Sequence, residues 1–349
     1  MIAVPSPLRL CLDRDALVAN WRWLAAQSGG AAACGAALKA DGYGLGARAV
    51  MQHLAAAGCR DFFVATWSEA AALMPLSAGV SLSVLHGVGA SDMVAARLLP
   101  ARPVLNSVEQ VRRWRDAGEG RPCDVMVDTG MNRLGLRVEE ALGGALDGLA
   151  IDTLMSHLAS ADEDSAQNGR QLAAFRALRE RIAARRYSLA NSAGICLGAD
   201  YAFDLTRPGI ALYGGIPRGE AAGHIGQVAF PEARVLQVRA VPTGETVGYG
   251  ASWTAARDSR VVVVNLGYAD GYLRCHAGSG RATWQGRALP LVGRVSMDLT
   301  AFDASDAAGL GEGEWLSLDY DLPAVSAQSG LSQYELLTGL GRRFERVWG

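Results

Sequence analysis

The chemistry that this sequence can perform centres on its single lysine. Lys39 is the one lysine among 349 residues, so the 33 basic residues comprise one lysine and 32 arginines. An arginine keeps its proton because its pKa lies above about 12, whereas a lysine can lose its proton and form a Schiff base. We therefore expect Lys39 to be a functional amine. A general replacement of surface lysines by arginine would explain the composition, but not the position of this residue.

The ends of predicted strands collect the other polar residues of interest. An apolar run from Ala31 to Leu38 predicts a buried strand that ends at Lys39. Later predicted strands end at, or are followed by, Arg133, His157, Asn191 and Ser192, and Arg207 belongs to the last predicted strand. Each has an ordinary alternative: a hydrogen-bonded core histidine, a surface arginine, or an Asn-Ser turn. Their shared position favours one site.

Strands that alternate with helices position these residues. Alternation of this kind indicates parallel strands joined by crossover helices. Helices are predicted at Ala16–Gln27, Ser107–Gly118 and Ser165–Arg185. Eight strands are predicted, at Ala33–Leu38, Phe62–Thr66, Leu82–His86, Pro103–Asn106, Asp124–Val127, Thr153–His157, Ser188–Asn191 and Leu205–Leu212. We expect an α/β fold whose N-terminal domain, residues 11–225, is a (β/α)8 TIM-type barrel with its active site at the carboxyl ends of the strands.

Residues 226–349 predict a second, mostly β domain. Its turns are rich in Gly and Asp, and a helix is predicted only at Gln333–Leu340. Strands are predicted at Val235–Ala240, Val261–Leu266, Ala282–Trp284, Leu289–Val295 and Trp315–Leu318. Residues 1–10, which include a predicted strand at Leu8–Leu12, are expected to pair with this domain.

Composition excludes several classes of protein. The net charge of −2 argues against a nucleic-acid partner. The six cysteines contain no CxxC pair, so neither a disulfide framework nor a metal site is expected. The N-terminus lacks the pattern of a signal peptide, and no apolar run reaches the roughly 20 residues that span a bilayer. We expect a soluble, cytoplasmic protein that does not engage a membrane.

Eight short motifs carry a resemblance to a known family. They are Leu38–Gly44, Asp128–Gly135, His157–Asp162, Ala190–Ser192, Arg207–Gly214, Val247–Gly250, Gly267–Tyr272 and Gly293–Asp298. In this order and over nearly the whole chain they resemble the alanine racemases. The resemblance implies a homodimeric enzyme with a barrel and a β domain, pyridoxal 5'-phosphate as cofactor, and active sites shared between subunits.

The resemblance also implies which residues bind the cofactor. Lys39 would hold it as a Schiff base, and His157 would pack against its ring. Its phosphate would be bound by Tyr43, Tyr334, Ser192 and the backbone N–H groups of Gly209 and Ile210, and Asn191 would also belong to the cofactor site. Arg207 would face the pyridine nitrogen and leave it unprotonated, which weakens the ring as an electron sink. Arg133 would contact the phenolic oxygen and the substrate carboxylate.

Racemisation needs a second acid–base group, because a proton leaves one face of Cα and returns to the other. The resemblance gives Lys39 to the D-isomer and Tyr249, from the partner subunit, to the L-isomer. Tyr268, Met297 and Asp298 would shape the substrate site. Taken alone, Tyr249 in a Gly-Tyr-Gly turn would be structural, and Met297 would fill the core.

One position departs from the family pattern. Many members carry a lysine, often carbamylated, whose anion steadies the arginine that matches Arg133. Here that position is Met126, which supplies no charge. A bound anion, another carboxylate or packing would have to hold Arg133, unless it is held less rigidly.

Several functions agree with these observations. The first is alanine racemisation that supplies D-alanine for peptidoglycan or serves alanine catabolism. A serine or broad-range amino-acid racemase of the same fold is the enzymatic alternative, since a small pocket excludes one hydroxyl poorly. A pyridoxal-phosphate-binding homeostasis protein is the non-catalytic one, although such proteins resemble the barrel alone.

Overall fold

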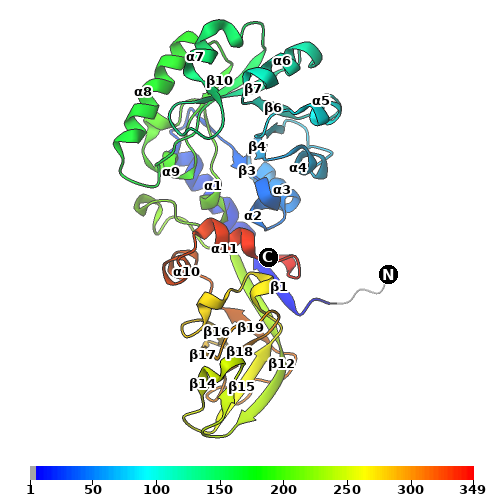
Figure 1. The fold of residues 1–349 in the computed structure, drawn as a ribbon, viewed down its shortest axis with the longest axis vertical. Coiled ribbons are helices and arrows are strands. Elements are labelled where there is room, and N and C mark those ends of the chain that lie inside the picture. Colours follow the sequence, from blue (N-terminus) through cyan, green and yellow to red (C-terminus); the bar gives the residue numbers. More distant parts are fainter. Residues whose placement is uncertain (1–4) are drawn as a thin grey trace. The chain divides into compact units, whose positions relative to one another are not determined.

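Eight parallel strands close into a barrel within residues 15–226. The computed structural model describes residues 5–349, which divide into two units, Asp15–Gly226 and residues 5–14 with Gln227–Gly349 (Figure 1). The barrel strands are β2 (Ala33–Cys34) with β3 (Ala36–Ala37), β4 (Asp61–Val64), β5 (Ser81–Val84), β6 (Arg102–Leu105), β7 (Cys123–Asp128), β9 (Ile151–Met155), β10 (Arg186–Ser188) and β11 (Leu205–Thr206). β8 (Leu136–Arg137) pairs beside β7. The predicted fold class is confirmed.

Backbone hydrogen bonds close the barrel. Strands β3 to β10 pair in parallel in the order β10-β9-β7-β6-β5-β4-β3, and β11 pairs with β2. The Asp204 N–H donates to the Tyr187 carbonyl at 3.0 Å, and the Arg207 N–H donates to the Ala190 carbonyl at 2.9 Å. These two bonds join the segment of β11 to that of β10. Because β11 also pairs with β2, the sheet closes into a barrel.

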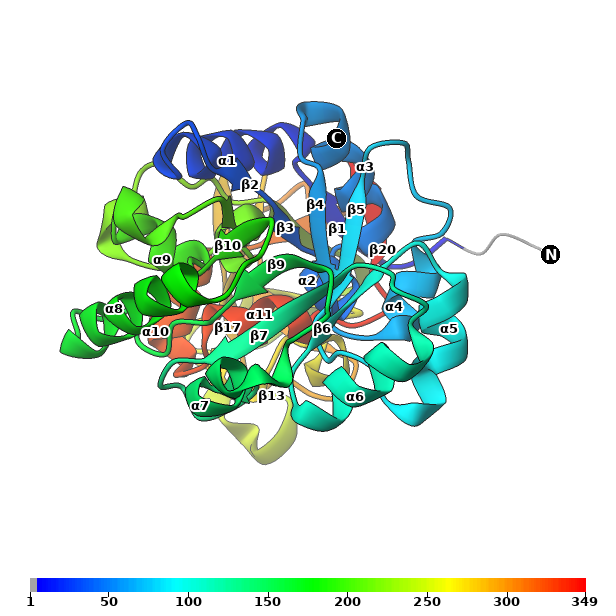
Figure 2. The same ribbon diagram turned by 90° about the horizontal axis from the view of Figure 1, so that it is seen from above.

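Helices surround the barrel strands (Figure 2). They are α1 (Arg14–Gln27), α2 (Lys39–Tyr43), α3 (Ala47–Ala57), α4 (Trp67–Ala72), α5 (Met93–Leu98), α6 (Val108–Ala117), α7 (Val138–Glu140), α8 (Ala166–Arg181) and α9 (Ser192–Cys196). Polar side chains start several of them, because the first N–H groups of a helix need acceptors. Thr66, Ser107, Ser165 and Asn191 cap α4, α6, α8 and α9.

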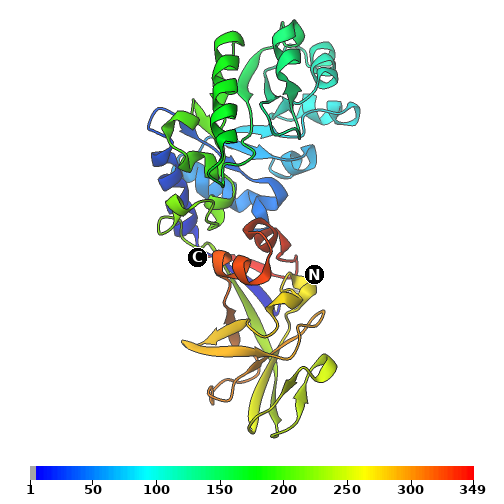
Figure 3. The ribbon, with the colours of Figure 1, turned by 60° about the vertical axis from the view of Figure 1, so that its left-hand side comes forward.

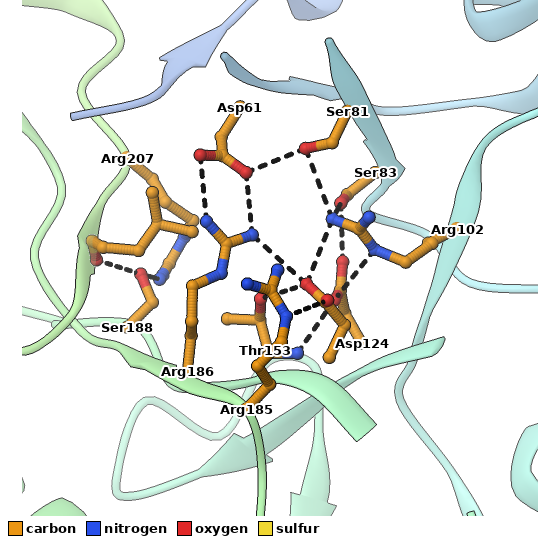
Figure 4. A network of polar contacts seen from close by, with 12 residues as sticks. Asp61, Ser81, Ser83, Arg102, Asp124, Thr153, Arg185, Arg186, Ser188 and Arg207 are labelled. Carbon is orange, nitrogen blue, oxygen red and sulfur yellow. Dashed lines mark hydrogen bonds and ion pairs between the residues drawn. The ribbon is translucent and has the colours of Figure 1, made fainter. Parts of the chain in front are cut away.

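Paired charges occupy the amino ends of the barrel strands (Figure 4). Arg186 binds both carboxylate oxygens of Asp61, at 2.7 and 2.9 Å. Arg102 contacts the fully buried Asp124 at 3.3 Å and Asp152 at 3.3 Å. Buried charges are tolerated when they are paired and hydrogen-bonded. In a barrel this end serves stability, which leaves the carboxyl ends of the strands for chemistry.

A ring of six antiparallel strands forms the second unit (Figure 3). It runs β12-β15-β18-β17-β16-β19 and returns to β12, whose two halves pair with different neighbours. The elements are β1 (Leu8–Leu12), β12 (Ala229–Val241), β13 (Thr246–Val247), β14 (Trp253–Thr254), β15 (Ser259–Val264), β16 (Arg281–Trp284), β17 (Arg287–Val292), β18 (Thr300–Asp303), β19 (Trp315–Leu318), α10 (Leu322–Ser329), α11 (Gln333–Gly339) and β20 (Glu345–Trp348). β1 pairs with β12 and β20. Residues 1–4 of the segment predicted to pair here lie outside the described residues.

Some predicted elements differ from the observed ones. The predicted strand Leu205–Leu212 is wrong beyond Thr206, because Pro208 lacks an N–H and Ile210–Tyr213 form a 3-10 helix. The predicted helix Ser165–Arg185 ends at Arg181. Sequence analysis also missed β18, β20 and α10. Within residues 5–349, no helix combines the length and apolar character that crossing a bilayer requires.

Candidate active site

The backbone that follows Lys39 turns in a left-handed sense. Lys39 opens α2 directly after β3, and Ala40, Asp41 and Tyr43 have φ values of 54°, 53° and 56°. Residues other than glycine adopt this conformation at a cost, and it persists only where its surroundings impose it. Glu69 provides one restraint, because its Oε1 accepts the Ala40 N–H at 2.7 Å. The turn therefore fixes where the lysine side chain starts.

Burial and one neighbouring cation lower the pKa of the Lys39 amine. The protein atoms packed around its side chain exclude part of the solvent, although the residue is exposed, and the Arg133 guanidinium repels its positive charge. Glu69 acts in the opposite direction, but the sum is a lowered pKa. A lowered pKa raises the fraction of neutral amine, the form that acts as a base or nucleophile.

A narrow cradle forms where Tyr43 meets the segment after β11. Ser192 Oγ accepts the Gly209 N–H at 2.8 Å and the Ala211 N–H at 3.3 Å. A Cβ on Gly209 would lie 2.2 Å from Tyr43 Oη, so only glycine fits against this tyrosine. Ile210 follows within the 3-10 helix, and Asn191 caps α9 through the Gly194 N–H at 2.8 Å. Hydroxyl and backbone N–H groups gathered in this way suit a phosphate.

Arg207 is buried and is held by neutral oxygens. Its Nη2 donates to the Ser156 carbonyl at 2.6 Å, and its Nη1 donates to Ser188 Oγ. Burial lowers its pKa to about 10, while Asp124 acts in the opposite direction. The guanidinium therefore remains charged at neutral pH. Figure 4 shows this contact between Arg207 and Ser188 next to the charged cluster.

His157 is neutral in this setting. Burial lowers its pKa to about 3, and the positive charges of Arg207, Arg133 and Lys39 add to the effect. These interactions show that all four side chains lie near one another at the carboxyl ends of the strands. A neutral imidazole can pack flat against a ring without adding a charge.

Arg133 extends from a loop whose backbone N–H groups are bound by the Asp128 carboxylate. Asp128 Oδ1 accepts the N–H groups of Gly130 and Met131, both at 2.8 Å, and Oδ2 accepts the Arg133 N–H at 3.0 Å. Although burial opposes it, these bonds lower the pKa of Asp128. The Arg133 side chain itself is exposed. These hydrogen bonds fix the backbone from which the Arg133 side chain extends.

Met126 belongs to the core of the barrel. It is 8% exposed and packs with Phe63, Val104, Met155 and Leu205. Met126 therefore serves packing and supplies no charge to Arg133.

Tyr249 lies in the second unit beside an arginine. It is 69% exposed and stands between Gly248 and Gly250, whose φ values are 77° and 70°. A Cβ on Gly250 would lie 3.3 Å from the Arg294 guanidinium, so the arginine packs against this turn. Both residues line a cavity of about 540 Å³ with an apolar wall of valines.

Tyr268, Met297 and Asp298 meet on two adjoining loops of the second unit. The Tyr268 N–H donates to the Ser296 carbonyl at 3.0 Å, and the Ala269 N–H donates to the Met297 carbonyl at 3.1 Å. Asp298 pairs with Arg343 at 2.7 Å. Tyr334 lies on α11 and is 47% exposed.

The predicted residues thus fall into two groups, each described within its own unit. The barrel unit gathers Lys39, Tyr43, Arg133, His157, Asn191, Ser192, Arg207, Gly209 and Ile210. The second unit holds Tyr249, Tyr268, Met297, Asp298 and Tyr334. Sequence analysis missed Glu69 and Ser188. The Thr66-x-x-Glu69 capping box was a usable signal for Glu69, whereas Ser188 carries none.

Comparisons with known proteins agree over the whole chain. The family model "Alanine racemase, N-terminal domain" matches residues 12–217, and "Alanine racemase, C-terminal domain" matches residues 228–348. An alanine racemase of Acidiphilium cryptum is 43% identical, over 97% of this chain and 98% of its own length. Two enzymes of Agrobacterium fabrum, named catabolic and biosynthetic alanine racemase, are each 41% identical over 97% and 98% of this chain and 91% and 94% of their own.

A solved structure supports the same relationship. The crystal structure of alanine racemase from Bartonella henselae with covalently bound pyridoxal phosphate superposes with a TM-score of 0.90 at 35% identity. The alignment covers 99% of this chain and 100% of that one.

Proposed function

Because this chain belongs to the alanine racemase family and is an enzyme of that family, we propose that it interconverts L-alanine and D-alanine with pyridoxal 5'-phosphate as its cofactor. The observation that carries the proposal is the placement of the sole lysine at the carboxyl end of a barrel strand, with its pKa lowered and Arg133 beside it. The B. henselae enzyme, which carries covalently bound pyridoxal phosphate, supports the choice of cofactor.

The residues of the barrel unit fit this cofactor. Lys39 Nζ would bind its aldehyde carbon, and its phosphate would lie against Tyr43, Ser192 and the N–H groups of Gly209 and Ile210. Asn191 would hold this loop, and Tyr334 would add a hydroxyl from α11. The contact between Gly209 and Tyr43 supports the assignment, because any larger residue would fill the cradle. When bound, the cofactor withdraws electrons from the substrate and acidifies its Cα–H bond.

Arg207 and His157 would set the electronic character of the site. Arg207 stays protonated, since its donors are bound by Ser188 and the Ser156 carbonyl and its pKa is about 10. Facing the pyridine nitrogen, it would leave that nitrogen without a proton. Neutral His157 would pack against the ring. By weakening the ring as an electron sink, Arg207 would disfavour side reactions such as transamination.

Two residues would move the proton. Neutral Lys39 would take the α-proton of D-alanine, and Tyr249 of the partner subunit would serve the L-isomer from the opposite face. The exposure of Tyr249 supports this role, because its hydroxyl is free of the core of its own unit. Arg133 and the Met297 N–H would bind the substrate carboxylate, with Tyr268 and Asp298 shaping the pocket. The active enzyme would then be a homodimer, and we propose that it acts in the cytoplasm.

The comparisons exclude one alternative function and leave the other to experiment. A non-catalytic homeostasis protein is excluded as the description of this chain, since residues 228–348 match the racemase C-terminal domain. Racemisation of serine is the enzymatic alternative that a substrate comparison decides. The chain would supply D-alanine for peptidoglycan or serve alanine catabolism. The catabolic and the biosynthetic enzyme of A. fabrum are equally similar to it, so similarity does not choose between the two roles.

Proton exchange tests the proposal. The wild-type enzyme should racemise alanine faster than serine, and Lys39→Ala should abolish the reaction. In deuterated water, Tyr249→Phe should still exchange the α-proton of D-alanine while exchange into L-alanine falls by about 100-fold or more. Each isomer serves as the control for the other. Equal losses for both isomers would contradict the assignment of the two bases.

A further inference from the structure

We propose that Gln171 is a positioning residue that holds the loop of Arg133 against the end of β9. The inference rests on the proposed function, in which Arg133 binds the substrate carboxylate. It also answers a question raised by Met126, which packs in the core and supplies no charge to this arginine. The support comes instead from a neutral amide on α8.

Within residues 5–349, the Gln171 amide bonds only to the two loops of the site. Its Nε2 donates to the His157 carbonyl at 3.0 Å and to Thr129 Oγ1 at 3.3 Å. Its Oε1 accepts the Ala159 N–H at 2.9 Å. Thr129 belongs to the Asp128–Arg133 loop, whereas His157 and Ala159 follow β9. One side chain thus ties together the segments that carry Arg133 and His157.

Burial makes these bonds consequential. Gln171 is 1% exposed, so loss of one of its bonds leaves a buried polar group without its partner. A second glutamine, Gln167, makes a parallel link near the surface: its Nε2 donates to the Gly130 carbonyl at 2.9 Å, and its Oε1 accepts from Ser160 Oγ at 2.9 Å. Residues 167 and 171 are one helical turn apart and therefore share a face of α8.

The link continues to Arg207. Thr129 Oγ1 shares a hydrogen bond of 2.7 Å with Ser156 Oγ, and the Ser156 carbonyl accepts from Arg207 Nη2 at 2.6 Å. Thr129 and Ser156 therefore connect Gln171 to the buried guanidinium, through the hydroxyl and the backbone carbonyl of Ser156. Its loss should loosen the Arg133 loop first, because Thr129 would keep only its bond to Ser156.

Asn168 provides a matched control on the same helix. It is 4% exposed, and its Nδ2 donates to the Ser160 carbonyl at 2.9 Å and the Glu163 carbonyl at 3.0 Å. Neither bond reaches the Arg133 loop. Gln171→Met and Asn168→Leu each remove a buried amide and keep its approximate shape. A purely structural role would make the two variants alike.

The test compares substrate binding with turnover in the holoenzyme. Gln171→Met should raise the KM for alanine about tenfold while kcat changes less than about threefold, the size expected for loss of one or two buried hydrogen bonds. Asn168→Leu should leave the KM within about twofold of the wild type. A KM that rises equally in both variants, or in neither, would overturn the inference.

Hydrogen exchange gives a reading that does not depend on activity. The amides of residues 130–133 should exchange faster in Gln171→Met than in the wild type, and at the wild-type rate in Asn168→Leu. If Gln171→Met fails to fold, Thr129→Val removes the acceptor on the loop and should give the same faster exchange. Unchanged exchange would overturn the inference even if the wild type racemises alanine. If the wild type shows no racemisation, the proposed function fails, and exchange still decides the role of Gln171.

Discussion

Gly209 faces Tyr43 so closely that a Cβ on the glycine would lie 2.2 Å from the tyrosine Oη. The contact shapes the cradle in which we place the cofactor phosphate. Gly209→Ala should displace the Tyr43 ring, which stacks on Tyr213 at 4.6 Å. We expect the dissociation constant of pyridoxal phosphate to rise at least about tenfold, because a hydroxyl donor is moved from the phosphate. Absorbance titration of the apoprotein measures it.

Gly219 supplies the control for this variant. It lies in the same unit, and a Cβ there would meet no atom within 4 Å. Gly219→Ala should leave cofactor affinity unchanged. Equal affinities in the Gly209 and Gly219 variants would show that the cradle does not bind the phosphate.

Ser188→Ala should destabilise the barrel unit through Arg207. The substitution leaves a buried guanidinium Nη1 without its acceptor, and such a loss costs about 2 kcal/mol when the donor is charged. Ser28→Ala is the comparison, since that buried serine bonds the neutral Leu24 carbonyl and Thr206 hydroxyl. Urea unfolding should show the larger loss for Ser188→Ala. A smaller loss than for Ser28→Ala would argue that water replaces the missing acceptor.

Arg343→Met should destabilise the second unit. Arg343 binds the fully buried Asp270 through Nε at 2.6 Å and Nη2 at 2.8 Å, and it also reaches Asp298. Removal of the cation leaves a buried carboxylate short of partners, which costs about 3 kcal/mol. Arg257→Met removes an arginine whose partner Asp306 is 87% exposed, so its cost should stay below about 1 kcal/mol. Comparable free energies of unfolding for the two variants would contradict this account.

His276 should make stability depend on pH. Burial lowers its pKa to about 4, and its Nε2 has no hydrogen-bond partner within the described residues. The ring is neutral in both states above pH 6.5. Between about 6.5 and 4 only the unfolded chain takes up the proton, so the folded state loses up to about 1.4 kcal/mol per pH unit. Stability falls as the pH is lowered.

His276→Phe should flatten this part of the profile while keeping a ring stacked on Tyr272, 4.1 Å away. Urea unfolding at pH 7.5, 6.0 and 5.0 measures the slope for both proteins. Burial also lowers the pKa of His157, to about 3, so His157 lowers the stability of the wild type and of the variant alike as the pH falls. An unchanged slope in the variant would show that His276 takes up its proton equally in the folded state.

The barrel and the position of its lysine were predictable because they depend on local patterns. Alternating strands and helices gave the fold, and the ends of the strands placed Lys39, His157 and Arg207 on one face. Patterns in the local sequence did not predict the backbone conformation where contacts with distant residues determine it. Ala40, Asp41 and Tyr43 adopt left-handed conformations that favour glycine, and they depend in part on Glu69, which is 29 residues from Ala40.

Supporting residues were the least visible in the sequence. Ser188 and Gln171 lie 19 and 42 residues from Arg207 and Thr129, which they bind. Their residue types occur widely in helices and strands, so no motif marks them. The strand predicted to reach Leu212 also failed for a tertiary reason, since Gly209 turns toward Tyr43.

Chemical labelling of Lys39 tests the central claim most directly. The purified protein, supplied with pyridoxal phosphate, is examined for absorbance near about 420 nm, reduced with borohydride and digested, and the modified peptide is identified. The account predicts an absorbance band that disappears on reduction and a phosphopyridoxyl group on Lys39 alone. Absence of the band, or a label confined to the N-terminal amine, would contradict it and would remove the basis for every catalytic role proposed here.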